Sequence, residues 1–454
     1  MPITRESIIG MLSEDVEGGL FRVRRSAFLD DELFELEMKH IFEANWVFLG
    51  HESQIPNPHD FFTTRIGRQP VFITRTAEGD LAGFLNSCSH RGAELLTAKC
   101  GNARRHTCPF HSWTFNSSGK LLAFGDSPVA GYGDGFRKAD LDLMPVAKVQ
   151  SYRGFIFGSL SADVLDLQDY LNGARVFIDM IVEQDPNGEI EIIPGPQAYT
   201  FDGNWKLQTE NGVDGYHVNS IHGNYVATTK NRAQIDGANA RVKPMDVASF
   251  AKFPGGFYAF RNGHVVLWNQ SPNPEVRATW HHQEDIARRS GDAKAWWMIN
   301  CWRNLCLYPN VFLMDQMSSQ IRMIQPISTG KTEIRTLCFA PKSDTLEERA
   351  NRIRQYEDFF NASGMATPDD VAAFNASQRG FHATGLEWSD VSRGSRNIVS
   401  GGDERASKIG ISPRFSGTQL QDEAIYLNQH HHWQDLLLKG LGEESIVRKE
   451  IVDA

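Results

Sequence analysis

Two short segments of the sequence each pair one cysteine with one histidine. They are Cys88 with His90, and Cys108 with His111, and together they read C-x-H-x17-C-x2-H. The whole chain has only six cysteines in 454 residues, so this spacing strongly limits how residues 88–111 can fold. Turn-forming residues accompany both pairs, Arg91-Gly92 after the first and Pro109 inside the second. The segment therefore predicts two facing loops, each of which presents one thiol and one imidazole.

This mixture of ligands differs from that of zinc modules, which usually group two cysteines at one end and two histidines at the other. A Rieske [2Fe–2S] cluster requires such a mixture, because two thiolates hold one of its irons and two imidazoles hold the other. Each loop can give its cysteine to one iron and its histidine to the other. The predicted cluster ligands are Cys88, His90, Cys108 and His111, and Trp113 is placed to shield the cluster from water.

Two further candidates, Cys100 and His106, lie between the pairs. Neither has a partner at one or two residues' distance, so we interpret both as bystanders. A structural zinc site in a zinc-stabilised interaction protein is the alternative interpretation of the segment.

Composition limits the class of protein. A chain of 454 residues exceeds the size at which a single core usually keeps growing, which favours two or more domains. The six cysteines are too few for a disulfide scaffold. The net charge of −10 and the pI near 5.9 argue against nucleic acid or a membrane surface as a partner. No signal-like segment or long apolar run is present, so we expect a cytoplasmic protein.

The order of the predicted elements gives an α+β fold. The segment DDELFELEMKHIFEANW, residues 30–46, has the apolar spacing of a helix. Short β-rich runs such as PVFITR and YRGFIFGSL follow, separated by turns such as NSSGK, so residues 41–158 are expected to form an all-β domain that carries the two loops. Residues 1–40 and 159–454 are assigned to a second, larger domain with helices and an antiparallel sheet, including a long hairpin turning at STGK. Its later helix TPDDVAAF is expected to start with Thr367 as cap and Pro368 in the first turn.

A second candidate metal site has the spacing D-x2-H-x4-H. It consists of Asp214, His217 and His222. Residues five apart on a helix are rotated by about 140°, so the helix must bend or end before His222 if both imidazoles bind one metal. Two imidazoles with a carboxylate from elsewhere are the facial triad of mononuclear Fe(II) oxygenases.

With these motifs in place, the chain resembles the large, catalytic component of the Rieske non-heme iron ring-hydroxylating dioxygenases. The stretches that carry the resemblance are FEANWVFLGHESQIP, CSHRGAEL, CPFHSWTFNSSGKLL and NWKLQTENGVDGYHVNSIH. Within that family it is most similar to the benzoate and toluate 1,2-dioxygenase group, through NLCLYPNVFLMDQMSSQIRMIQP and LNQHHHWQ. Anthranilate and 2-halobenzoate dioxygenases are near relatives of that group.

The resemblance implies roles for particular residues. It assigns the mononuclear iron to His217, His222 and Asp370, and it makes Asp214 a carboxylate that bridges the two metal centres between neighbouring subunits. Asp369 and the pair Glu357 and Asp358 remain alternatives to Asp370. The loop ENGVDGYH is one residue shorter than in many relatives, so no role is assigned to Asn211. The triple histidine 430–432 is interpreted as part of a solvated helix.

The activity implied by the resemblance is cis-dihydroxylation of an aromatic carboxylate of the benzoate type. Electrons from NADH are expected to arrive through a separate reductase, O2 is the co-substrate, and the assembly is expected to be a trimer with a small β subunit, α3β3. Anthranilate or 2-halobenzoate dioxygenation and salicylate-type ring monooxygenation are the alternatives within the family. A buried cation or a set of polar amides must hold the substrate carboxylate, but the sequence does not identify it.

Overall fold

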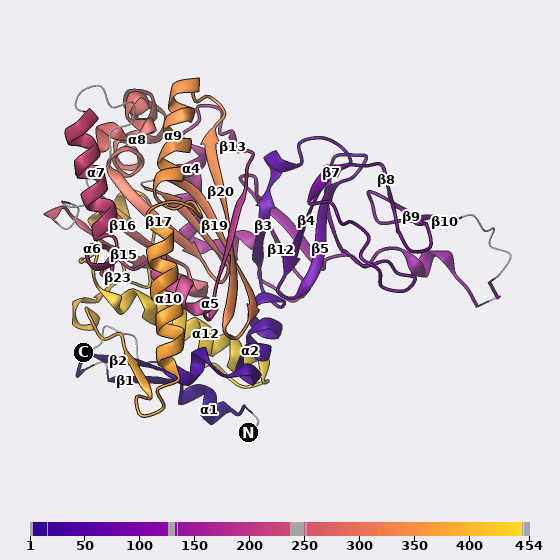
Figure 1. Cartoon of the computed structure of the whole chain (residues 1–454), viewed down its shortest axis with the longest axis horizontal. Coiled ribbons are helices and arrows are strands. Elements are labelled where there is room, and N and C mark those ends of the chain that lie inside the picture. The colour runs from indigo at the N-terminus through magenta and orange to yellow at the C-terminus, as the bar shows by residue number, and fades with distance from the viewer. Residues whose placement is uncertain are drawn as a thin grey trace. The chain divides into compact units, whose positions relative to one another are not determined.

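The computed structural model describes residues 3–15, 17–125, 132–133, 135–236, 249, 252–316, 318–446 and 448. The chain forms two compact units (Figure 1). One unit is continuous and comprises Phe42–Leu167. The other is discontinuous and comprises Met1–Ile41 together with Gln168–Ala454. Among the described residues, no helix has the length and apolar character needed to cross a membrane.

The continuous unit consists of three small antiparallel sheets, with the orders β6-β5-β4-β7, β11-β12-β3 and β10-β9-β8. Their strands are β3 Val47–His51, β4 Asp60–Ile66, β5 Gln69–Arg75, β6 Leu81–Leu85, β7 Cys100–Asn102, β8 Arg105–Thr107, β9 Trp113–Asn116, β10 Leu121–Phe124, β11 Lys148–Tyr152 and β12 Phe155–Ser159. The β-rich run YRGFIFGSL contains the end of β11, a turn at Arg153 and Gly154 with positive φ, and β12. The turn expected at NSSGK joins β9 to β10.

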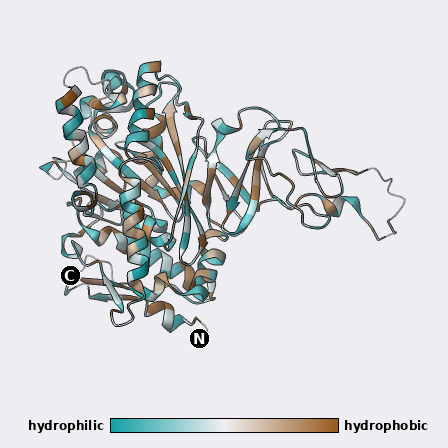
Figure 2. Ribbon diagram, in the orientation of Figure 1, coloured by the Kyte–Doolittle hydropathy of each residue, from teal (hydrophilic) through white to brown (hydrophobic). Residues whose placement is uncertain are grey.

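A ten-stranded antiparallel sheet forms the centre of the discontinuous unit, in the order β13-β20-β19-β18-β17-β16-β15-β23-β22 with β14 paired to β20. Apolar residues dominate its middle strands, which are buried (Figure 2). The strands are β13 Ile190–Ile192, β14 Gln197–Phe201, β15 Gly255–Ala259, β16 Val265–Gln270, β17 Cys301–Leu307, β18 Val311–Asp315, β19 Ser319–Ser328, β20 Lys331–Pro341, β22 Val399–Ser400 and β23 Phe415–Gly417. A smaller sheet joins β1 Leu12–Asp15, β2 Leu20–Arg24 and β21 Trp388–Asp390. The expected hairpin is β19–β20, and the predicted α+β class is confirmed.

Helices pack around this sheet (Figure 1). They are α1 Arg5–Ile9, α2 Asp31–Glu37, α3 Leu167–Leu171, α4 Arg175–Val182, α5 Trp205–Asn211, α6 Val218–Ile221, α7 Gly223–Asp236, α8 Gln283–Asn300, α9 Leu346–Asp358, α10 Thr367–Phe381, α11 Glu404–Lys408 and α12 Tyr426–Gly440. The helix expected over 30–46 is shorter: Asp30 caps α2, which continues only as a π-helical turn over Met38–Phe42. At α10 the predicted cap is wrong, because Ala366 is the N-cap residue and Thr367 is already helical. Pro368 lies in the first turn as expected.

A buried carboxylate joins the two chain segments of the discontinuous unit. Glu37 of α2 forms an ion pair with Lys206 of α5 at 2.5 Å, and the two side chains are 1% and 4% exposed. The carboxylate oxygens of Glu37 also accept hydrogen bonds from the indole N–H groups of Trp205 and Trp433, each at 2.7 Å. A buried pair with these additional donors resists loss of either partner. The first forty residues are therefore fastened to α5 and to the C-terminal α12.

The triple histidine of α12 is not solvated, so that prediction is wrong. His430 and His431 are buried, and each meets a carboxylate from a distant part of the chain. Nε2 of His430 lies 2.8 Å from Glu210, and Nε2 of His431 lies 2.7 Å from Glu14. Burial lowers the pKa of His432 to about 3. These histidines connect α12 to α5 and β1, and their neighbours give them a structural role.

Candidate metal centre and cluster loops

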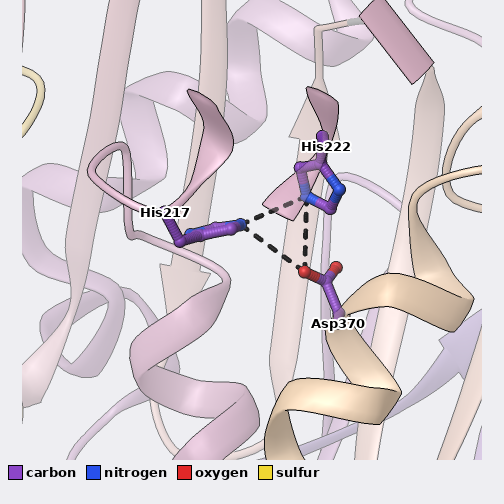
Figure 3. Close-up of side chains that lie close together, drawn as sticks. All are labelled: His217, His222 and Asp370. Carbon is purple, nitrogen blue, oxygen red and sulfur yellow. Dashed lines mark hydrogen bonds and ion pairs between the residues drawn. The ribbon is translucent and has the colours of Figure 1, made fainter. Parts of the chain in front are cut away.

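His217 and His222 flank a helix of a single turn. His217 is the N-cap residue of α6, which ends at Ile221, and His222 is its C-cap residue. The chain then enters α7 at Gly223. The predicted break before His222 is therefore present, and it turns both imidazoles toward the same point (Figure 3).

The third member of this group comes from α10, about 150 residues further along the chain. Nε2 of His217 and Nε2 of His222 are 3.2 Å apart, and Oδ1 of Asp370 lies 3.5 Å and 3.3 Å from them. Two ligands at right angles on a metal with bonds of about 2.1 Å are separated by about 3.0 Å. The three atoms thus form a nearly equilateral triangle of the size that one face of an octahedral ion requires, and the residues fit a mononuclear iron.

The acidic alternatives to Asp370 are arranged differently. Asp369 is one residue earlier in α10, and its Oδ2 lies 3.8 Å from Nδ1 of His222, on the side of the ring away from the triangle. Asp358 is bound instead to Arg232 at 3.3 Å and to Arg354 at 3.2 Å. Of these carboxylates, Asp370 is the one that meets both histidines at Nε2.

Asp214 supports the other side of the His217 ring. Its Oδ1 accepts hydrogen bonds from the backbone N–H groups of Tyr216 at 2.6 Å and His217 at 3.2 Å, while Oδ2 lies 3.1 Å from Nδ1 of His217. Burial opposes ionisation of Asp214, but the hydrogen bond and charge of His217 outweigh it and lower the pKa of this carboxyl. Burial likewise lowers the pKa of His217, and Asp214 outweighs it, so that this pKa is raised. Asp214 thus faces Nδ1 of His217, where its charge favours a proton, and Nε2 faces the triangle.

Asn211, to which the sequence assigned no role, belongs to this centre. Its Nδ2 lies 3.3 Å from Nε2 of His217 and donates to Oδ1 of Asp370 at 3.3 Å. It is the last residue of α5, and Gly212 follows it where a Cβ atom would meet the ring of Phe312 at 2.4 Å. The close contact between helix and sheet brings the amide to the carboxylate. The sequence signal for this role was the tripeptide ENG at residues 210–212. Because the loop is one residue shorter than in many relatives, the sequence alone did not match Asn211 to their asparagine.

A pocket opens beside the triangle, and the empty space in it, including the part open to solvent, is about 600 Å³. His217 and His222 contribute to its wall together with residues of the central sheet. Among the latter are Leu267, Asn304, Met314 and Arg322, which come from four neighbouring strands, β16 to β19. The lining combines aromatic and aliphatic groups with a few polar ones, as in typical sites for small molecules. An aromatic ring has room next to the candidate iron position.

In the continuous unit, the two predicted loops have matching backbone hydrogen bonds. The N–H of Cys88 donates to the carbonyl of Ala93, five residues on, and the N–H of Cys108 donates to the carbonyl of Trp113, also five residues on. Gly92 and Ser112, each four residues after its cysteine, donate back to that cysteine's carbonyl. Both also have positive φ, 76° and 56°. The sequence therefore builds the same tight turn twice.

These turns bring the four predicted cluster ligands together. Cys88 and Cys108 are buried in one apolar cluster with Trp113, and burial raises the pKa of the Cys88 thiol, with the neighbouring Cys108 adding to the effect. The rings of His90 and His111 are 4.6 Å apart, and His90 is stacked on Trp113 at 4.6 Å with an interplanar angle of 7°. Both histidines are exposed while both thiols are buried. Two adjacent thiols and two adjacent imidazoles are the donor set of a Rieske cluster.

The two bystander residues lie outside this group. Cys100 is exposed on β7. His106 is buried on β8, with its ring 5.6 Å from that of Phe61 and 5.4 Å from that of Phe72. Burial lowers its pKa to about 4, so it is a neutral core residue.

Two known protein families match this chain. Residues 45–132 match the Rieske [2Fe-2S] domain family, and residues 189–437 match the ring hydroxylating alpha subunit (catalytic domain) family. The chain is 47% identical to the toluate 1,2-dioxygenase subunit alpha of Pseudomonas putida, over 98% of this chain and 97% of the relative. It is 46% identical to the 2-halobenzoate 1,2-dioxygenase large subunit of Burkholderia cepacia, over 97% and 94%.

Other relatives extend the comparison. The anthranilate 1,2-dioxygenase large subunit of Acinetobacter baylyi is 42% identical over 95% of this chain and 93% of its own length. Among solved structures, a naphthalene 1,2-dioxygenase mutant bound to phenanthrene superposes with a TM-score of 0.79 at 26% identity, covering 94% of each chain.

The chain therefore belongs to the family of ring-hydroxylating dioxygenase alpha subunits, the large subunits of aromatic ring dioxygenases. The cofactors of this family are a Rieske [2Fe–2S] cluster and a mononuclear iron, with O2 as co-substrate and electrons supplied from NADH by a reductase.

Proposed function

We propose that this chain is the terminal oxygenase subunit that adds both atoms of O2 to an aromatic carboxylate of the benzoate type, giving a cis-diol. The observation that carries the proposal is the triangle of His217, His222 and Asp370 at the wall of a cavity with room for one aromatic ring. The names of the toluate, 2-halobenzoate and anthranilate relatives favour an aromatic acid as substrate.

The proposal assigns each metal group to particular residues. Cys88, His90, Cys108 and His111, in a domain spanning 41–158, hold the cluster. His217, His222 and Asp370, in the domain of 1–40 and 159–454, hold the iron. When bound, the cluster supplies electrons and the iron supplies the activation of O2.

The remaining steps belong to the chain's own side chains. Asp214 holds the proton of His217 on Nδ1, which keeps Nε2 unprotonated and available as a ligand atom. Asn211 donates an amide proton to Oδ1 of Asp370 and thereby fixes that carboxylate. The apolar wall of the cavity excludes water from the ring that is to be oxidised.

Exposure of the cluster histidines favours an assembly in which subunits meet there. His90 and His111 are exposed, and the adjacent Phe110 is 56% exposed, which suits an interface. A head-to-tail ring of three chains would let His111 of one subunit approach Asp214 of the next, so that this carboxylate bridges the two centres. We propose such a trimer together with a small β subunit, α3β3. Size-exclusion chromatography with light scattering of the co-expressed subunits tests the assembly.

Product analysis tests the reaction. The purified protein, a reductase and NADH are incubated with benzoate, ring-substituted benzoates, anthranilate and salicylate, and the products are identified by mass spectrometry under 18O2. A cis-diol that carries two labelled oxygens is the expected product. A product with a single labelled oxygen would instead make the protein a ring monooxygenase of the salicylate type.

A further inference from the structure

A buried arginine of the central sheet lines the cavity. Arg322 lies in the middle of β19, and its side chain is 1% exposed. Among the residues that the structure describes, Nε and Nη2 of Arg322 have no hydrogen-bond partner, and no carboxylate lies within ion-pair distance of it. A buried cation without a counter-charge is costly, so natural proteins rarely keep one unless a ligand compensates it.

The other cation of the described lining and two of its amides have partners. Arg303 forms an ion pair with Asp315, which Arg277 also binds at 2.9 Å. The amides of Gln316 and Asn304 are joined by a hydrogen bond of 2.5 Å, and Asn304 also donates to the carbonyl of Gly212 at 3.0 Å. In the described lining of the cavity, Arg322 is therefore the cation without a carboxylate partner.

The carboxylate of Asp370 does not fill this role. Its Oδ1 is shared by His217, His222 and the amide of Asn211. The charges of Asp370 and Arg322 both act on Tyr199, so the two groups belong to one neighbourhood, but they form no ion pair. A bound iron would take up the charge of Asp370 still further.

A pair of phenylalanines places Arg322 close to the candidate iron position. The ring of Phe359 is 5.5 Å from that of His222, and the ring of the next residue, Phe360, lies 4.6 Å from the guanidinium carbon of Arg322. Stacking covers one face of a guanidinium and leaves its N–H edge available. Nε and Nη2 form one such edge, and their two parallel N–H groups match the two oxygens of a carboxylate.

From this geometry we infer that Arg322 binds the carboxylate of the aromatic substrate through Nε and Nη2, and so orients the ring at the iron. This inference rests on the proposed function and specifies its substrate as an anion. It makes Arg322 a specificity-determining residue. An uncharged ring of the same shape would leave the cation uncompensated and would bind less well.

The test compares Arg322→Gln and Arg322→Lys with the unmodified holoenzyme, using benzoate and its uncharged analogue benzamide. In Arg322→Gln, kcat/KM for benzoate should fall about 100-fold or more, mainly through KM, while kcat/KM for benzamide should change less than about threefold. Arg322→Lys should recover part of the loss, because lysine restores the positive charge but lacks the two parallel N–H groups of the guanidinium. Calorimetric titration with benzoate should show the same order of affinities without turnover.

Stability separates this role from a structural one. Removing an unpaired buried cation should leave the melting temperature without benzoate unchanged or raised, and the cluster absorbance and iron content should stay as in the exposed control Arg175→Gln. Benzoate turnover within threefold of the unmodified enzyme in Arg322→Gln, or an equal loss with benzamide, would overturn the inference. If the unmodified enzyme oxidises neutral arenes and no aromatic acid, the proposed function falls and the inference falls with it.

Discussion

Replacement of Asp214 by asparagine tests how the second carboxylate controls the iron site. The oxygen of the new amide should stay on the side of the backbone N–H groups of Tyr216 and His217, because rotating the amide would set its NH2 group against both donors. The NH2 group then faces Nδ1 of His217, where Oδ2 was 3.1 Å away. Two donors now oppose each other unless His217 moves its proton from Nδ1 to Nε2.

That change of tautomer places a proton on the atom that faces His222 and Asp370, so it competes directly with the metal. Loss of such an orienting hydrogen bond typically weakens metal affinity or activity about 10- to 100-fold, or about 1.4–2.7 kcal/mol. We expect Asp214→Asn to keep its cluster, to bind Fe(II) correspondingly more weakly, and to turn over slowly even at saturating Fe(II).

Two measurements check the effect. Fe(II) titration of chelator-treated protein gives the affinity, and rapid mixing of the reduced, substrate-bound variant with O2 gives the rates of cluster reoxidation and product formation. Asp202→Asn, at an exposed position ahead of α5, is the matched control. If Asp214→Asn matches the unmodified protein in both affinity and reoxidation rate, the role assigned to this carboxylate is refuted.

Three further predictions concern metal ligands and pH. Asp370→Ala should lose the mononuclear iron and all oxygenation while the visible spectrum of the cluster persists, whereas Asp369→Ala should keep its iron. Metal analysis of both variants measures this difference, and the reverse result would identify Asp369 as the ligand. Cys108→Ser should abolish the cluster spectrum and Cys100→Ser should not, since only Cys108 is buried beside Cys88; loss of the spectrum in both would show that the ligand set is wrong. Burial lowers the pKa of His264 to about 4. As pH falls, this side chain therefore takes up a proton near pH 6.5 in the unfolded chain but only near pH 4 in the folded protein. Between these two pH values the difference removes up to about 3 kcal/mol from the free energy of unfolding. In denaturant unfolding at several pH values, the free energy of unfolding of His264→Gln should therefore fall less steeply with decreasing pH than that of the unmodified protein. The same pH dependence in both proteins would contradict a buried, neutral His264.

Local spacing carried most of what could be predicted about the metal sites. The cluster pairs and the pair His217 and His222 each lie within a few residues, so their ligand types and turns are visible in the sequence itself. Asp370 is about 150 residues away and shares its helix turn with Asp369. Periodicity cannot tell which of two adjacent acids faces the histidines, and the choice depended on family resemblance.

Interactions between distant segments account for the failures. The histidines 430 and 431 were expected in solvent because their partners, Glu210 and Glu14, are more than two hundred residues away in sequence. Arg322 escaped notice for a related reason. It lies in the largely apolar segment IRMIQP, and its sequence context is that of an ordinary strand residue. Only the tertiary structure reveals that its charged group lacks a partner. A cation inside a predicted central strand is nevertheless a signal that sequence inspection can use.

The discontinuity of the larger unit has a consequence during protein synthesis. Residues 42–167 are contiguous and can fold as soon as they leave the ribosome, whereas Glu37 must wait for Trp433. At about 5–20 residues per second, the roughly 270 intervening residues take about 15–50 s to be made. We therefore expect the nascent chain to mature in a fixed temporal order, in which the loops of Cys88 and Cys108 are shaped well before Trp433, the last partner of Glu37, has emerged.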